Sequence, residues 1–105
     1  MSACVYTHTN KRTGEVFYVG SIGTHPRDLR PAMRGSRWGQ YFREVLGSDA
    51  SAIEVNVIPM PDVGEALAAE WDLVRKHLPV ANPGTAVAKD WGYLKEVMIT
   101  LPSRG

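Results

Sequence analysis

The chain has 105 residues, of which 44% are hydrophobic and 22% charged, with a formal net charge of +1, the composition of one globular domain with a single core. No apolar run is long enough to span a membrane, and the N-terminus lacks the basic start and apolar core of a signal peptide, so we expect a soluble, cytoplasmic protein. The single cysteine excludes an internal disulfide and argues against a zinc site, and we expect Cys4 to be a small buried apolar residue.

Two stretches near the N-terminus predict an antiparallel hairpin. Residues 3–9 and 16–20 are rich in β-formers, and the intervening "NKRTGE" supplies Asn and Gly for a tight connection. Side chains alternate along a strand, so Tyr6 and His8 share a face of the first strand, while Tyr18 lies on the second. The pattern leaves the register open, and with it the question of whether the two tyrosines share a face.

A basic loop follows the hairpin. Two glycines and two prolines interrupt residues 21–36, and Pro31 limits this segment to a short helical turn from Arg27. Six basic residues lie between Lys11 and Arg37 against two acidic ones, a distribution that suits either a polyanion-binding surface or a solvated one. If this surface binds a polyanion such as a nucleic acid, the side chains expected to contact its phosphates are Lys11, Arg30, Arg34 and Arg37.

A helix and a third strand come next. Residues 36–46 have apolar side chains at helical spacing, with Ser36 as a possible N-cap and Gly47 as a stop signal. Residues 51–60 alternate like a strand. The apolar residues expected to point inward from that strand are Ile53, Val55 and Val57.

The last strong pattern is a helix over residues 63–78, capped by Asp62 and ended by Pro79. The stripe predicted to face the core consists of Val63, Leu67, Trp71, Val74 and Leu78. Glu70 falls just outside this stripe. A carboxylate there reaches water, pairs with an arginine of the loop, or holds a divalent metal ion, and the pattern leaves these alternatives open.

The C-terminal segment, residues 85–105, predicts one short amphipathic helix. Its apolar face consists of Trp91, Leu94, Val97 and Met98. A helix of this kind caps the core, forms a dimer contact or contributes to a nucleic-acid surface.

Several of these residues, taken together, resemble the GIY-YIG nucleases. "CVY" at 4–6 and "YVG" at 18–20 are similar to the paired motif that names the family. Arg27 stands where the family has its arginine, Glu70 where a helix carries the metal-binding glutamate, and Asn82 near the asparagine that closes the core. The flanking "TNKRTGEVFYVG" and "GSRW" resemble its compact members. The resemblance covers about residues 3–84 of a single domain spanning 1–105, and rests on four elements in order.

The chain also departs from the family pattern. Cys4 and Val5 replace Gly and Ile of the first motif, while Ser21 stands where many members have Lys. The loop after Gly20 is about one residue longer than in the compact members, so Arg30 is an alternative to Arg27 as the family's arginine.

The resemblance implies an α+β fold, a small three-stranded antiparallel sheet flanked by helices in a β-α-β-β-α core. It also implies a DNA endonuclease that depends on Mg²⁺ or Mn²⁺, with one metal ion held by Glu70. Of Tyr6 and Tyr18, one assists the base that activates water and the other orients the scissile phosphate, while Arg27 offsets the developing charge. Since the ordinary tyrosine pKa is about 10, nearby cations are required to favour the phenolate.

The family pattern assigns further residues and leaves other questions open. His8 and His25 are additional catalytic candidates, and Gly20 and Asn82 are expected to shape or close the site. A second hypothesis is a nuclease-like domain without turnover that binds nucleic acid or a protein partner. The small size suits a phage or mobile element, and the pattern leaves open whether the protein is a monomer or a homodimer.

Overall fold

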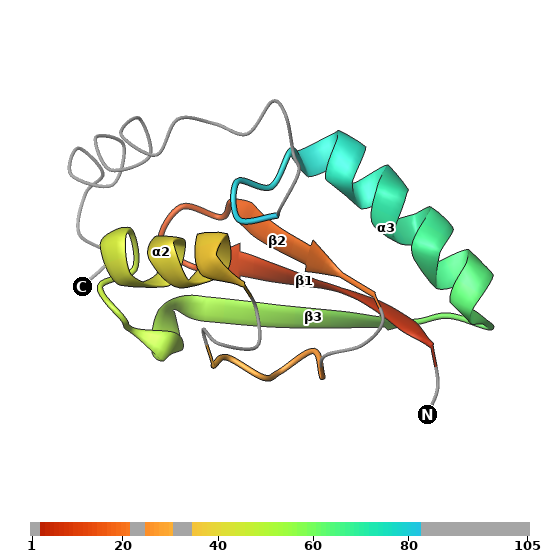
Figure 1. Ribbon diagram of the computed structural model, residues 1–105, viewed down its shortest axis with the longest axis horizontal. Helices are drawn as coiled ribbons and strands as arrows, with labels where there is room; N and C mark the ends of the chain where they lie inside the picture. Colours follow the sequence, from red (N-terminus) through yellow and green to blue (C-terminus); the bar gives the residue numbers. More distant parts are fainter. Residues whose placement is uncertain (1–2, 22–24, 31–34, 83–105) are drawn as a thin grey trace.

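The computed structural model describes residues 3–21, 25–30 and 35–82 (Figure 1). Its elements, in chain order, are β1 (Cys4–Asn10), β2 (Val16–Gly20), α2 (Ser36–Glu44), a 3-10 turn (Ala50–Ala52), β3 (Ile53–Pro59) and α3 (Val63–His77). These ranges form an α+β domain with one three-stranded antiparallel sheet, as predicted. Within them no helix has the length and apolar character needed to cross a membrane. The helix predicted in 85–105 lies outside the described residues.

The sheet has the strand order β2-β1-β3, with β1 in the centre. The predicted element order β-α-β-β-α is wrong, because β1 and β2 follow each other as a hairpin and the first described helix comes after both. Asn10 closes the hairpin turn: its N–H donates to the carbonyl of Glu15 at 2.8 Å, and its own carbonyl accepts from Gly14 at 2.7 Å. Gly14 has φ 77°, a left-handed conformation that glycine adopts at low cost.

A β-bulge turns two consecutive residues of β2 toward the same side. His8 pairs with Tyr18 and Thr9 pairs with Val16, so Phe17 is the extra residue. Phe17 stacks on Tyr41 of α2, with ring centroids 4.3 Å apart and planes 13° from parallel. Without the bulge, strand alternation would direct Phe17 to the opposite face from Tyr18. The bulge therefore lets β2 contribute both to the core and to the face that carries His8.

The main core lies between α2 and the end of the sheet where β1 ends (Figure 1). The apolar residues expected from helix 36–46 pack there, but Ser36 is not its cap: Gly35 holds the N-cap position without a side-chain hydrogen bond. Along β3, Ile53 is buried, Val55 is half-buried and Val57 is exposed. The prediction that Val57 points into the core is wrong. Its side chain is exposed because α2 covers only the end of the sheet near Ile53.

Helix α3 begins at the predicted cap, where Asp62 accepts a hydrogen bond from the Glu65 N–H at 2.8 Å. It packs on β1 and β2 through a face of small and half-buried side chains around Ala66, which is fully buried. The predicted inward stripe is wrong: Trp71 is 64% exposed and Leu67 39%. A small residue at 66 lets the helix backbone approach the sheet, whereas bulky side chains on that side would hold it away.

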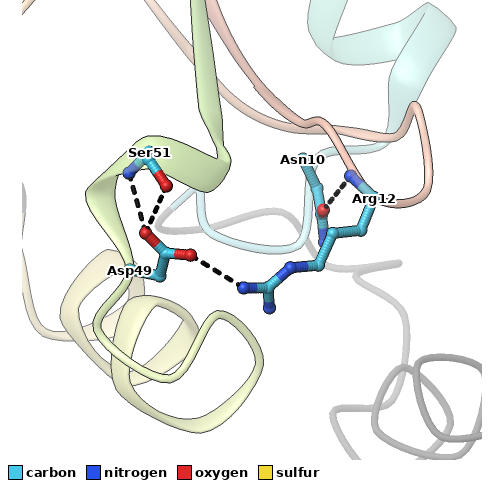
Figure 2. A network of polar contacts seen from close by, with 4 residues as sticks. All are labelled: Asn10, Arg12, Asp49 and Ser51. Carbon is cyan, nitrogen blue, oxygen red and sulfur yellow. Dashed lines mark hydrogen bonds and ion pairs between the residues drawn. The ribbon is translucent and has the colours of Figure 1, made fainter. Parts of the chain in front are cut away.

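A polar network joins the hairpin turn to the segment before β3 (Figure 2). The Arg12 guanidinium binds the Asp49 carboxylate at 3.0 Å, and Asp49 also accepts from the N–H and hydroxyl of Ser51 at 3.0 and 2.5 Å. These hydrogen bonds from Ser51, together with the charge of Arg12, lower the pKa of Asp49. Arg12, one of the six basic residues between Lys11 and Arg37, thus has a structural ion-pair partner.

Gly20 makes a close approach to the ring of Tyr6. The two residues pair across β1 and β2, and a β-carbon on Gly20 would lie 2.3 Å from Cζ of Tyr6 and 2.4 Å from its Oη. No side chain fits at that distance, so Tyr6 occupies the volume that a residue other than glycine would need. The family-based expectation that Gly20 has a structural role thus has a steric reason.

Replacing Gly20 with Ala is expected to destabilise the fold by about 1–3 kcal/mol, because the methyl group displaces the Tyr6 ring. Urea unfolding of the variant measures this cost. In a Tyr6→Ala background the same change is expected to be neutral or stabilising, since alanine in a strand loses less conformational freedom than glycine. Equal cost in both backgrounds would contradict the steric explanation.

Candidate functional site

The register of β1 and β2 brings the two motif tyrosines onto one face of the sheet. Tyr6 pairs with Gly20 and His8 pairs with Tyr18, so Tyr6 and Tyr18 are diagonal neighbours with ring centroids 6.2 Å apart. Tyr6 is buried and Tyr18 is half-buried. The question left open by the sequence is thus answered: the tyrosines share a face, with the ring of Tyr18 the more accessible.

His8 lies beside both tyrosines, with its ring centroid 5.5 Å from that of Tyr6 and 5.4 Å from that of Tyr18. It is fully buried, and both of its ring nitrogens have partners. Nδ1 is 3.1 Å from the indole Nε1 of Trp38, and Nε2 is 2.8 Å from the carbonyl oxygen of Pro26. His8 therefore has its nitrogens directed at protein groups, an arrangement that suits holding structure more than exchanging protons with water.

The arginine loop, residues 25–30, follows β2 and is folded on itself. The Asp28 N–H donates to the carbonyl of His25 at 3.0 Å, and the Arg27 N–H donates to His25 Nδ1 at 3.2 Å. The imidazole of His25, a predicted catalytic candidate, is exposed. Its hydrogen bond from the Arg27 N–H helps to fix the backbone conformation at Arg27. Leu29 packs against the core and fixes the other side of the loop.

The two arginines of this loop differ in what they bind. Arg30 makes two hydrogen bonds to the Asp28 carboxylate, at 2.9 and 2.6 Å, and this carboxylate raises the pKa of Arg30. The Arg27 guanidinium is exposed and makes no hydrogen bond or ion pair with any other residue that the structure describes. Of the two candidates, Arg27 has its side chain available for an external anion.

Glu70 lies on the sheet-facing side of α3, one turn after the buried Ala66. It is half-buried, and α3 contacts β1 and β2, the strands that carry Tyr6 and Tyr18. Its carboxylate has no hydrogen bond or ion pair within residues 3–21, 25–30 and 35–82, so it does not pair with Arg27 or Arg30. The ion pair that the sequence left as an alternative is therefore absent among the described residues.

The segment after α3 binds the outer edge of β2. Asn82 Oδ1 accepts from the Val19 N–H at 2.8 Å and its Nδ2 donates to the Val19 carbonyl at 2.9 Å, while the Ala81 N–H donates to the carbonyl of Phe17 at 2.9 Å. Val19 lies between Tyr18 and Gly20. Asn82 thus holds the strand at the point where the second motif presents its tyrosine.

The expected phosphate contacts are dispersed. Lys11 is exposed in the hairpin turn, at the opposite end of β1 from Tyr6, and Arg34 lies outside the described residues. Arg37, in the first turn of α2, donates through Nε to the carbonyl of Val80. This bond gives Arg37 a structural role, anchoring the segment that closes on β2, and sequence reasoning missed it.

The site also depends on residues that the sequence did not single out. A buried indole N–H needs an acceptor, which is the one signal that could have pointed to Trp38, but nothing in the pattern identifies His8 or Pro26 as partners. Tyr41 shows what a tyrosine outside the site does: Asn10 donates to its hydroxyl at 3.1 Å, and burial raises the pKa of Tyr41 to about 12. Tyr41 stays protonated and serves the core.

The metal site predicted from the sequence has Glu70 as its one named ligand. No group of three or more His, Cys, Asp or Glu side chains in the described ranges is arranged to hold a metal ion. The predicted Mg²⁺ site does not need such a group, because Mg²⁺ is commonly held by one or two carboxylates together with waters and substrate phosphates. A half-buried carboxylate with no hydrogen bond or ion pair to another described residue fits that requirement.

No family model, no curated protein and no solved structure matches the chain.

Replacing Asn82 with Ala is expected to destabilise the fold by about 1–3 kcal/mol, because the N–H and carbonyl of the buried Val19 lose their partners. Thermal or urea unfolding measures this effect. Asn56→Ala is the matched control, since Asn56 is exposed and its side chain bonds only to the Glu54 carboxylate among the contacts that the structure describes. Equal stability of the two variants would mean that Asn82 does not secure β2.

Proposed function

We propose that this protein is a divalent-metal-dependent DNA endonuclease of the GIY-YIG type, a hydrolase acting on phosphodiester bonds. The observation that carries the proposal is the shared face of Tyr6 and Tyr18, whose ring centroids are 6.2 Å apart. The tyrosines come from two different motifs, and their neighbourhood requires a specific register, a bulge and a glycine at position 20. A surface tyrosine with a packing role needs none of these.

In the proposed reaction the two tyrosines act on water and phosphate. One, as phenolate, accepts a proton from the attacking water, and the other donates a hydrogen bond to a non-bridging oxygen of the scissile phosphate. The half-burial of Tyr18 gives it access to a substrate, while Tyr6 lies deeper against Gly20. In this proposal the two tyrosine hydroxyl groups on one face of the sheet act on the same phosphate.

Arg27 supplies positive charge on the side of the arginine loop. Its exposed guanidinium, which has no side-chain partner among the described residues, is able to bind two phosphate oxygens at once, and this interaction strengthens as negative charge develops on them. Arg30 is the weaker candidate, because binding a phosphate would require it to leave the Asp28 carboxylate.

Glu70 is the group that would hold Mg²⁺ or Mn²⁺. A bound divalent cation neutralises charge on the phosphate and on the leaving oxygen. The contribution of the chain itself is a carboxylate on a helix that packs against the strands of both tyrosines, and it makes no ion pair with Arg27 or Arg30. Burial in part makes that carboxylate a stronger ligand for a cation than a fully hydrated one.

Cleavage of supercoiled plasmid tests the proposal. The wild-type protein is expected to nick the plasmid with Mg²⁺ or Mn²⁺ and not with EDTA, and Glu70→Gln is expected to lose at least about 100-fold in rate while still binding DNA in a gel-shift experiment. Glu65→Gln, an exposed carboxylate of the same helix, is the matched control and is expected to cut normally. A wild-type protein that binds DNA without nicking supercoiled, linear or branched substrates would favour the binding module without turnover.

Comparison of Arg27→Ala with Arg30→Ala separates the two arginines. The first is expected to lower the nicking rate by about 100-fold, the size of effect seen when one charge-stabilising donor is removed. The second is expected to change the rate by much less, because its side chain is already bound to Asp28. The reverse order of the two effects would assign the role to Arg30.

A further inference from the structure

The protonation pattern of His8 follows from its two partners. An indole N–H is a donor only, so His8 Nδ1 must accept from Trp38 at 3.1 Å. A carbonyl oxygen is an acceptor only, so Nε2 must carry the proton that it shares with Pro26 at 2.8 Å. The bonding network therefore selects the neutral Nε2–H tautomer.

The two hydrogen bonds connect parts of the chain that are distant in sequence. Trp38 belongs to α2 and is fully buried, whereas Pro26 belongs to the arginine loop and precedes Arg27 directly. His8 itself belongs to the central strand β1. A single imidazole thus links the core, the sheet and the loop.

The rings around His8 hold the imidazole in place. Its centroid is 6.0 Å from that of Trp38 and 6.1 Å from that of Phe17, in addition to its contacts with Tyr6 and Tyr18. A ring surrounded in this way has little rotational freedom, so the direction of its Nε2–H is fixed by the core.

We infer that His8 is a positioning residue: its Nε2–H holds the carbonyl of Pro26, and so holds the loop of Arg27 against the strand that carries Tyr6. The attachment of the loop stands on the geometry alone, while its consequence for catalysis rests on the proposed nuclease function. Loss of the bond frees the loop and moves Arg27 away from the substrate, because the accepting carbonyl is part of the peptide bond that joins Pro26 to Arg27.

Two substitutions separate the two hydrogen bonds of His8. The amide oxygen of Asn lies near the position of Nδ1, so His8→Asn keeps an acceptor for Trp38 and removes the donor to Pro26. The amide nitrogen of Gln reaches the position of Nε2, so His8→Gln keeps the donor to Pro26 and removes the acceptor. Only His8→Asn is expected to release the loop.

Limited trypsin digestion, with products identified by mass spectrometry, measures the release directly. Trypsin cuts after Arg27, whereas the Arg30–Pro31 bond resists it, so one cut reports on the loop. Relative to cleavage after Arg12 and Arg43, His8→Asn is expected to raise cleavage after Arg27 about tenfold, and His8→Gln to leave it unchanged. Equal cleavage after Arg27 in His8→Asn and wild type would overturn the inference.

Nicking and binding assays add the catalytic readout. His8→Asn is expected to lower the nicking rate about tenfold without weakening DNA binding, and His8→Gln to retain the rate. Faster tryptic cleavage in His8→Asn, with a wild type that fails to nick DNA, would support the positioning role and overturn the nuclease proposal. Reduced nicking with unchanged cleavage after Arg27 would overturn the positioning role alone.

A measurement on the wild-type protein covers the case in which His8→Asn does not fold. Long-range ¹H–¹⁵N correlation NMR distinguishes the protonated from the bare nitrogen of each histidine ring. The expected result at neutral pH is a proton on Nε2 of His8 and none on Nδ1. A proton on Nδ1 would remove the acceptor for Trp38 and overturn the inference.

Discussion

Two hydrogen bonds to one buried imidazole define how the candidate site is assembled. The acceptor nitrogen of His8 takes the indole proton of Trp38, and the donor nitrogen binds the Pro26 carbonyl. Each bond satisfies a polar group that would be costly to bury alone. Because His8 also contacts the rings of Tyr6 and Tyr18, the packing of the core and the placement of the loop depend on the same side chain.

Much of the secondary structure was predictable because its signals are local. Strand composition, the turn residues after Asn10 and the cap at Asp62 each act within a few residues, and the elements form where these signals predict them. The element order attached to the family resemblance was wrong, although the hairpin was evident in the chain itself. Ser36 was preferred as a cap on residue type, but the backbone at Gly35 takes that position.

The sequence indicated candidate site residues, but it did not indicate how they lie relative to one another. Whether Tyr6 and Tyr18 share a face depends on the strand register and on a bulge. The sequence pattern is compatible with other registers, so it did not settle this question. The inner face of α3 was predicted from hydrophobicity, yet the helix approaches the sheet through Ala66 and leaves Trp71 outside. Periodicity reports which residues share a face of a helix, but not which face meets the sheet, since small side chains pack as well as large ones.

The contact between Tyr6 and Gly20 ties the two motifs to each other. The ring occupies the space of an absent β-carbon, so the first motif determines what the second is able to contain. Substitutions at these positions are conditional: a chain that loses the tyrosine is released from the glycine, and a chain that gains a side chain at 20 must first give up the ring. We therefore expect residues 6 and 20 to vary together among relatives, in a correlation set by steric exclusion that would persist in descendants without any catalytic activity.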